Sequence, residues 1–334
     1  MALDPQIRDS LSLPAICAPM FLVSGPDLVR EACKAGLIGG LPRNNARSFE
    51  LWETWMDDIH ADLKEFRAEF PDARIGPVAV NMTARQPDFA EHLAVCKRHK
   101  VRILITAQGD PIETVKRVHD WGGLVYHDVT NLRFAEKAIQ AGVDGLTCIG
   151  AGGGGHSGTI SLMSFIPKVR SMFDGTIIMA GTVSTGAGIR AAEVLGADLA
   201  YLGTRFIATQ ESNARDAYKQ LLVSQQSKDV MYTGKIAGLP ANWLMESMRM
   251  VGLDPDKLPT PAGRDANHLP DGAKPWKTIW SAGQGVDLID DIPTVAELAR
   301  RLQREYLAAC ETPSMAVATR QAMAALDRAH ATTP

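Results

Sequence analysis

Residues 176–183, Thr-Ile-Ile-Met-Ala-Gly-Thr-Val, form an apolar run that ends in a glycine turn. A second run of this kind, Val-Arg-Ile-Leu-Ile-Thr-Ala, covers residues 101–107. Strands that are covered on both faces have this composition and occur in parallel sheets, whereas a strand with one face in water alternates apolar with polar residues. Both runs therefore predict buried strands of a parallel sheet.

Similar short runs alternate with helix-like stretches along the first two thirds of the chain. The expected strands cover residues 15–20, 37–40, 75–81, 101–107, 124–129, 143–149, 176–183 and 199–206. Eight βα units in series predict an α/β fold, and their even, unbroken spacing favours a closed (β/α)8 TIM barrel over a doubly wound sheet.

The length of the chain exceeds what a barrel needs. A typical barrel takes ~250 residues, and this chain has 334. The eight units end near residue 210, and we expect helices over residues 216–227 and 243–251. The sequence therefore predicts one barrel, residues 1–210 and 277–334, with a helical insertion after the eighth strand, residues 211–276, that covers the ligand face. The amphipathic tail segments are also expected to be helices that pack on the barrel.

Charge and cysteine content exclude several function classes. The 35 Lys and Arg against 38 Asp and Glu leave no basic excess for nucleic acid. The chain has five cysteines, an odd number, and no two of them have C-x-x-C spacing. Neither a disulfide scaffold nor a metal site is therefore expected. Residues 1–13 are charged without an apolar core, and no apolar run reaches ~18 residues. We expect a cytoplasmic protein with a small-molecule substrate and no membrane or nucleic-acid partner.

In a barrel of this type, chemistry collects at the carboxyl ends of the strands. Turns use glycine and asparagine in any case, but polar or glycine residues at so many strand ends favour a ligand face. These residues include Ala18, Pro19, Met20, Asn81, Gln108, His127, Asp128, Ala180, Gly181, Thr182, Gly203 and Thr204. At this stage Asp128 either pairs with His127 or contacts a ligand.

Residues 150–158, Gly-Ala-Gly-Gly-Gly-Gly-His-Ser-Gly, give the strongest single signal. They match the dinucleotide fingerprint G-x-G-x-x-G literally, but no helix opens on these glycines and the unit is sixth in the series, so we reject that interpretation. Consecutive glycines instead let backbone lie against a planar ligand or expose N–H groups to it. His156 follows directly. A lone histidine is often structural, but at a barrel mouth an imidazole can exchange a proton near neutral pH, so we expect His156 to be catalytic.

The pairs Gly181-Thr182 and Gly203-Thr204 suggest a phosphate site, because barrels commonly bind phosphate with the loops after their last two strands. Arg205 adds charge there or forms a structural ion pair. A phosphate site beside a glycine surface suited to a planar ring indicates flavin mononucleotide (FMN).

Taken in order, these motifs resemble the nitronate monooxygenases, once called 2-nitropropane dioxygenases. The wider group includes FMN-dependent enoyl-acyl-carrier-protein reductases and NADH:quinone reductases. The resemblance covers almost the whole chain and rests on residues 14–20, 154–158, 180–182, 203–206 with 211–212, and 282–284.

The resemblance implies a barrel that binds FMN tightly beside an active-site histidine, at the position of His156. It places Ala18, Pro19, Met20, Asn81, Gln108, Gly181, Gly203, Thr204 and Gln284 around FMN. With the strand ends and the glycine run, Asp128, Ala151, Gly152, Gly153, Ala180 and Thr182 complete the expected cofactor site. The family's histidine is proposed to deprotonate neutral nitroalkanes or to assist the substrate.

The expected reaction is oxidation of alkyl nitronates, with O2 as cosubstrate, to carbonyl compounds and nitrite. An NAD(P)H-dependent FMN reductase acting on quinones or enoyl thioesters stays open, because this fold can stack a nicotinamide on flavin without a separate fingerprint. A flavin-binding protein without turnover is a third alternative, against which His156 argues. The sequence leaves the exact substrate, the use of NAD(P)H and a homodimer open.

Overall fold

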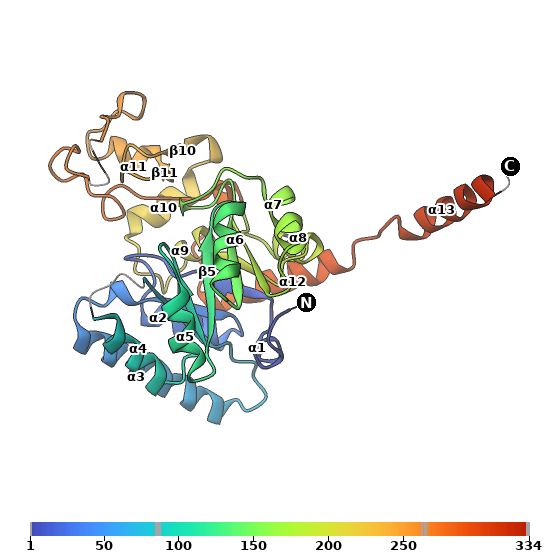
Figure 1. Cartoon of the computed structure of the whole chain (residues 1–334). Helices are drawn as coiled ribbons and strands as arrows, with labels where there is room; N and C mark the ends of the chain where they lie inside the picture. The colour runs from blue at the N-terminus through green and yellow to red at the C-terminus, as the bar shows by residue number, and fades with distance from the viewer. Residues whose placement is uncertain (1, 84–87, 262, 264–265, 332–334) are drawn as a thin grey trace.

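The computed structural model describes residues 2–83, 88–261, 263 and 266–331. At its centre is a closed barrel of parallel strands in the order β1-β2-β3-β4-β5-β6-β8-β9, in which β9 pairs back to β1. Helices surround the barrel (Figure 1). The predicted (β/α)8 barrel is confirmed.

The barrel strands are short and almost entirely buried. They are β1 (Ala15–Cys17), β2 (Ile38–Pro42), β3 (Val78–Met82), β4 (Ile103–Thr106), β5 (Leu124–Val129), β6 (Gly145–Ile149), β8 (Thr176–Ala180) and β9 (Leu199–Leu202). Side chains such as Ile16, Ile105 and Ile178 fill the barrel interior. Several strands end earlier than predicted; after β9, for example, Thr204–Ile207 form a helical turn.

The helices lie outside the strands and mostly follow the predicted order. They are α1 (Pro5–Ser10), α2 (Pro26–Lys34), α3 (Phe49–Glu69), α4 (Phe89–Arg98), α5 (Ile112–His119), α6 (Leu132–Gln140), α7 (Leu162–Arg170), α8 (Gly186–Leu195), α9 (Thr204–Ile207), α10 (Asp216–Ser224), α11 (Met245–Arg249), α12 (Val295–Cys310) and α13 (Ala316–Ala331). Short 3-10 turns are η1 (Arg43–Asn45), η2 (Ser227–Asp229), η3 (Pro255–Lys257) and η4 (Gln284–Leu288). A second apolar core packs these helices against the barrel.

The segment 211–276 combines the expected helices α10 and α11 with two strands that the sequence analysis did not predict. Strands β10 (Val230–Thr233) and β11 (Ala241–Leu244) pair antiparallel, and β11 pairs in turn with β7 (Gly155–His156). The insertion is therefore joined by backbone hydrogen bonds to the glycine run that carries His156.

The helix predicted over residues 243–251 is wrong at its start. Trp243 and Leu244 belong to β11, and the helix begins only at Met245. Trp243 lies opposite Met231 of β10 and is fully buried. Pairing with a distant strand overrides the helical spacing of the apolar residues.

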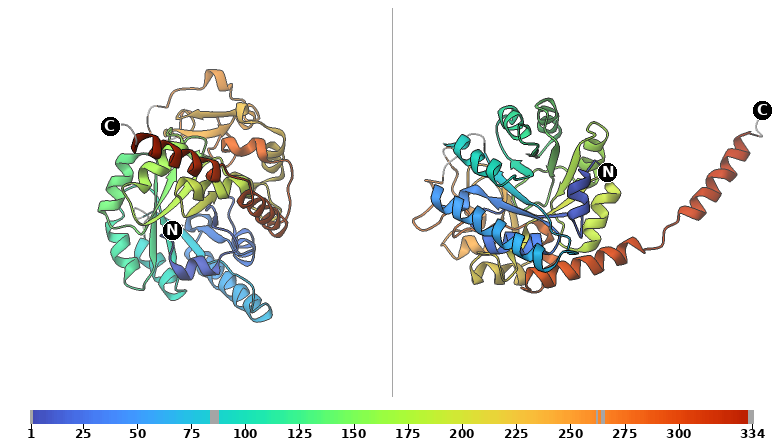
Figure 2. Two further views of the ribbon diagram at one scale, coloured as in Figure 1. Left: turned by 90° about the vertical axis from the view of Figure 1, so that its right-hand side faces the viewer. Right: turned by 90° about the horizontal axis from the view of Figure 1, so that it is seen from below.

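The two tail helices behave differently. α12 buries an apolar stripe that includes Val295, Leu298 and Leu302, and it packs on α8 and α2. α13 projects away from the barrel in Figure 1 and in the right-hand view of Figure 2, and its described side chains are exposed. The expectation that both helices pack on the barrel is wrong for α13, which is rich in alanine and offers no comparable stripe.

No helix in the described ranges combines the length and the apolar character that crossing a bilayer requires.

Candidate active site

A cavity of about 1550 Å³ opens at the carboxyl ends of the barrel strands. Most of the residues predicted from the sequence line it together, although they come from seven different strands or loops. They are Ala18, Pro19, Met20, Asn81, Gln108, Asp128, Gly153, His156, Ala180, Gly181, Thr182, Gly203 and Thr204. The structure thus brings the predicted strand-end residues and the glycine run into one site.

Three predicted residues, Ala151, Gly152 and Gln284, lie behind the cavity wall and not on it. The backbone N–H of Gln284 donates to the Gly152 carbonyl at 2.9 Å, and the backbone N–H of Ala151 donates to the Ile160 carbonyl at 2.8 Å. Their contacts hold the glycine run in place from outside.

Gly152 and Gly154 fit their surroundings so closely that a side chain at either position would crowd its neighbours. A Cβ on Gly152, whose φ is +81°, would come within 2.7 Å of Thr182 Oγ1 and 2.8 Å of Gln284 Oε1. A Cβ on Gly154 would lie 3.0 Å from the Gly283 amide nitrogen. The run therefore presents bare backbone to the cavity, as an anion or a planar ring requires.

Three of the described residues in the cavity wall, Gln108, Thr182 and Trp276, adopt a left-handed backbone without being glycine. Gln108, after β4, has a φ of 60°, and Thr182, after β8, has a φ of 62°. Such backbone is strained for these residue types and concentrates at functional sites. Gln108 and Thr182 were predicted to contact the cofactor, whereas Trp276, with a φ of 66°, belongs to the insertion and was not predicted.

His156 stands at the edge of the cavity, half-buried between the glycine run and the insertion. Its Nδ1 lies 3.3 Å from the Pro240 carbonyl oxygen, and its ring meets Trp276 edge-on with centroids 5.3 Å apart. When Nδ1 donates to that carbonyl, Nε2 carries the free lone pair and can accept a proton. The imidazole is thus held by two residues of the insertion.

The insertion adds residues that the sequence analysis missed. Tyr232 and Trp276 line the cavity. Tyr232 also donates its hydroxyl to the Ser157 carbonyl at 3.0 Å. The buried Asn242 amide donates to the Gly153 carbonyl at 2.7 Å and to Ser157 Oγ at 3.2 Å. No spacing in the sequence connects these residues with the glycine run, because their proximity depends on the sheet of β7, β10 and β11.

Asp128 is a partly buried acid in the cavity wall. Burial raises the pKa of its carboxyl to about 7, and Oδ1 has no partner among the described residues. Its neighbour His127 points to the other side of β5, where Nδ1 lies 2.8 Å from Thr106 Oγ1, and burial lowers the pKa of its imidazole to about 4. Of the two alternatives for Asp128, pairing with His127 is not what the structure shows.

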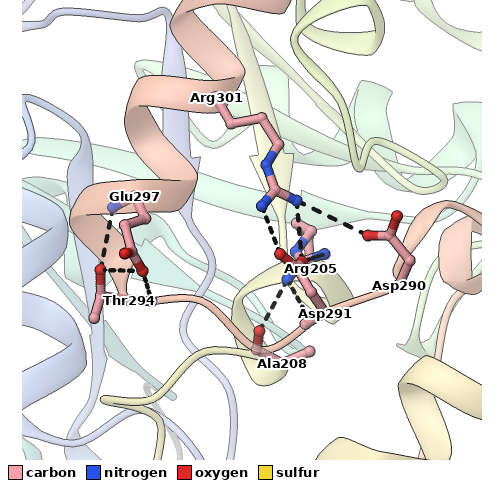
Figure 3. A network of polar contacts seen from close by, with 7 residues as sticks. All are labelled: Arg205, Ala208, Asp290, Asp291, Thr294, Glu297 and Arg301. Atoms are coloured by element: carbon pink, nitrogen blue, oxygen red, sulfur yellow. Dashed lines mark hydrogen bonds and ion pairs between the residues drawn. The ribbon is translucent and has the colours of Figure 1, made fainter.

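Arg205 does not face the cavity. Its guanidinium forms an ion pair with Asp291 at 3.3 Å and donates to the carbonyls of Ala208 and Asp291 at 2.9 Å each (Figure 3). This is the structural ion pair that the sequence left as an alternative. Lys137 is the only lysine or arginine among the described residues that line the cavity, so a phosphate there must be held mainly by backbone amides and hydroxyl groups.

This chain shares sequence with several proteins of known name, among them a monooxygenase and a dehydrogenase. A nitronate monooxygenase from Paraburkholderia phytofirmans is 28% identical, with a match that covers 87% of this chain and 92% of the relative. A (3aS,4S,5R,7aS)-5-hydroxy-7a-methyl-1-oxo-octahydro-1H-indene-4-carboxyl-CoA dehydrogenase from Rhodococcus jostii is 27% identical over 68% of this chain. That match spans 61% of the dehydrogenase's own length.

The fold is similar to that of a nitroalkane oxidase from Streptomyces ansochromogenes, with a TM-score of 0.72 at 24% identity over 92% of this chain and 99% of the other. A profile of the nitronate monooxygenase family matches residues 44–305, which include β3 to β9, the glycine run and the whole insertion. The chain therefore belongs to the nitronate monooxygenase family and is a flavin-dependent oxidoreductase.

Proposed function

We propose that the protein binds FMN in the cavity at the carboxyl ends of the barrel strands, called the mouth cavity below. There it oxidises alkyl nitronates with O2 to carbonyl compounds and nitrite. The observation that carries this proposal is the position of His156 at the edge of the cavity, beside the glycine run, in a chain of this family. The cavity is also large enough for a flavin and a small substrate together.

The residues present fit an FMN molecule. Backbone of the glycine run and of Gly181 and Gly203, with the hydroxyls of Thr182 and Thr204, would hold the phosphate without a basic side chain. We expect the apolar residues after β1 to support the ring, and Asn81 and Gln108 to supply hydrogen bonds at the ends of β3 and β4. When bound, FMN supplies the electron acceptor that the oxidation requires.

His156 handles the proton in this scheme. A neutral nitroalkane must lose its α-proton before it becomes a nitronate, and Nε2 of His156 can accept that proton at the cavity edge. A preformed nitronate needs no base, and the protonated imidazole would then stabilise its negative charge.

We propose that the insertion selects the substrate. Its side chains Tyr232, Leu239 and Trp276 form the outer wall of the cavity, where they exclude water and limit the size of the substrate. This proposal retains the division of the chain into a barrel, residues 1–210 and 277–334, and a covering segment, residues 211–276.

A second candidate is an NAD(P)H-dependent FMN reductase acting on an enoyl thioester or a quinone. It is favoured by the name of the Rhodococcus relative, which contains a coenzyme A thioester. The cavity volume of about 1550 Å³ leaves room for a long substrate beside a flavin.

Anaerobic mixing of the flavin-loaded protein with either reductant tests both candidates. We expect an alkyl nitronate to diminish the absorbance of oxidised flavin within the turnover time, and nitrite to form when air is admitted, whereas NADH or NADPH should act slowly or not at all. Rapid bleaching by a nicotinamide without a response to nitronates would reject the first candidate in favour of the second.

A further inference from the structure

A second cavity, of about 290 Å³, lies at the amino-terminal end of the barrel. It is bounded by α1, by the second half of α3 and by the segments that lead into β3 and β4. In Figure 1, α1 and α3 lie on the side of the molecule opposite the insertion, so this cavity is separate from the candidate active site. Its charged and titratable lining residues are His60, Lys64, Arg67, His99, Lys100 and Arg102.

The charge in this second cavity has one sign. No aspartate or glutamate occurs among its described lining residues. Within the described ranges Lys64, Arg67 and Lys100 form no ion pair, and all three are exposed. Three cations without a counter-charge around one hollow repel each other, and an anion would relieve that repulsion.

Two of the cationic or titratable lining residues already have a carboxylate partner. Asp4 pairs with Arg102 at 2.8 Å, and Asp57 lies 3.0 Å from His99 Nε2. The Arg102 guanidinium also donates to the Gly122 carbonyl, so its charge and its donors are engaged outside the cavity. Lys64, Arg67 and Lys100 remain free to contact a ligand directly.

Lys100 has an unusual backbone for a lysine. Helix α2 ends on the left-handed Gly36 (φ +76°), α6 on Gly142 (φ +81°) and α8 on Gly196 (φ +104°), whereas α4 ends on Lys100 with a φ of 51°. The hydrogen bonds around Lys100 are those of the same motif, with the Val101 amide donating to the Cys96 carbonyl at 2.9 Å.

The left-handed conformation strains any residue that carries a Cβ, and glycine adopts it without strain. A lysine at this position is therefore less favourable for folding than the glycine that equivalent helices carry. Retained strain of this kind indicates a role for the side chain, and here the residue lines the cation-rich cavity.

We propose that this second cavity binds a small polyphosphate group through Lys64, Arg67 and Lys100. Lysine and arginine form charge-assisted hydrogen bonds with phosphate oxygens, and a group with several negative charges matches three unpaired cations. The volume of about 290 Å³ suits a diphosphate or triphosphate group and not a whole dinucleotide. This site does not depend on the reaction proposed for the mouth cavity.

Calorimetric titration of the flavin-loaded protein with inorganic pyrophosphate, at constant ionic strength, tests the proposal. Loading with flavin keeps the phosphate region of the active site occupied. We expect saturable binding that sulfate at equal ionic strength does not reproduce. A parallel titration with ATP distinguishes two sources of the phosphate group. Tighter binding of pyrophosphate than of ATP would indicate a free polyphosphate, and tighter binding of ATP would indicate a nucleotide.

The decisive variant is Lys100→Gly, since glycine relieves the backbone strain. It should weaken pyrophosphate binding about tenfold, as expected for the loss of one charge-assisted contact, while the thermal midpoint stays equal or rises. Arg67→Ala should weaken binding similarly. Lys97→Ala is the matched control. Lys97 is exposed on α4, the helix that precedes Lys100, but it does not line the cavity, so this variant should bind pyrophosphate like the parent protein.

Absence of saturable binding in the parent protein would overturn the proposal. So would equal affinity in the parent and in Lys100→Gly and Arg67→Ala, or an equal loss of affinity in Lys97→Ala, which would indicate a general response to surface charge.

Discussion

At the scale of single residues, the role proposed for His156 as a base predicts a difference between two forms of the substrate. If its Nε2 removes the α-proton, His156→Asn should reduce turnover of a neutral nitroalkane about 100-fold or more, in the range for loss of a general base. Turnover of the same compound supplied as its nitronate should fall less than about tenfold, because no proton has to be removed. Nitrite release from the two forms measures the difference.

An equal loss with both forms would contradict a role of His156 as base and would indicate that the ring only positions the substrate. His268→Asn is a suitable control, because that histidine also belongs to the insertion but bonds to the Lys235 carbonyl and does not line the cavity.

Asp128 makes stability depend on pH. Its carboxyl titrates near 3.8 in the unfolded chain, and burial raises the pKa to about 7 in the folded protein. Between these values the unfolded chain releases a proton that the folded chain keeps, so the free energy of unfolding decreases as pH rises through this window. Asp128→Asn should therefore be more stable than the parent protein by about 1–4 kcal/mol above pH 7 and similar to it near pH 4.

Urea unfolding of the flavin-free proteins at pH 4, 6 and 8 measures this difference. A constant gap across the three pH values would show that Asp128 does not carry a raised pKa.

At the scale of elements, the sequence predicted the barrel because each of its strands is recognisable locally. Runs such as Ile103–Thr106 and Thr176–Ala180 are almost continuously apolar. The glycines that follow the neighbouring helices mark where those helices end. Strand β7 has only two residues, Gly155–His156, and it exists because β11 lies beside it. A contact between segments about 85 residues apart leaves no periodic signal, so the small sheet and the side chains that it brings to the site could not be predicted.

Asn242 is the side chain through which β11 holds the glycine run. It is buried and donates two hydrogen bonds, to Gly153 and to Ser157. Asn242→Ala leaves these acceptors unsatisfied, and we expect a loss of about 1–3 kcal/mol in the free energy of unfolding together with weaker FMN binding.

Tyr232→Phe is the matched comparison for Asn242→Ala. It removes one hydrogen bond to Ser157 from a partly exposed side chain, so its effect on both quantities should be smaller. Chemical denaturation and flavin titration of both variants measure these effects. Normal flavin affinity in Asn242→Ala would show that the glycine run keeps its shape without the insertion.

At the scale of the whole molecule, the two ends of the barrel differ in charge and in covering. The cavity at the carboxyl end is lined in part by the insertion and by a single lysine among its described residues, whereas the cavity at the amino end is lined by several cations. α12 ties the chain back to the barrel: the Glu305 carboxylate accepts from the Gly186 amide at 2.7 Å, at the start of α8. The apolar cores of the barrel and the insertion include no residue of α13 within the described ranges.

The last prediction therefore concerns α13. A helix with exposed side chains contributes little to stability, because packing of an apolar face supplies most of the stability of helices in proteins. A chain that stops at Glu311 should keep the thermal midpoint, flavin content and turnover of the parent protein. Thr294→Ala, which removes the capping box at the start of the packed helix α12 (Figure 3), should instead cost about 1 kcal/mol.

Light scattering of both proteins completes this comparison, because the sequence left a homodimer open. We expect the parent protein and the shortened chain to have the same number of subunits. A fall in subunit number, or a thermal midpoint several degrees lower, would mean that α13 packs on a second copy of the chain. Its exposed side chains Val317, Met323 and Leu326 would then be the contact surface, and their replacement by serine should reproduce the effect of the truncation.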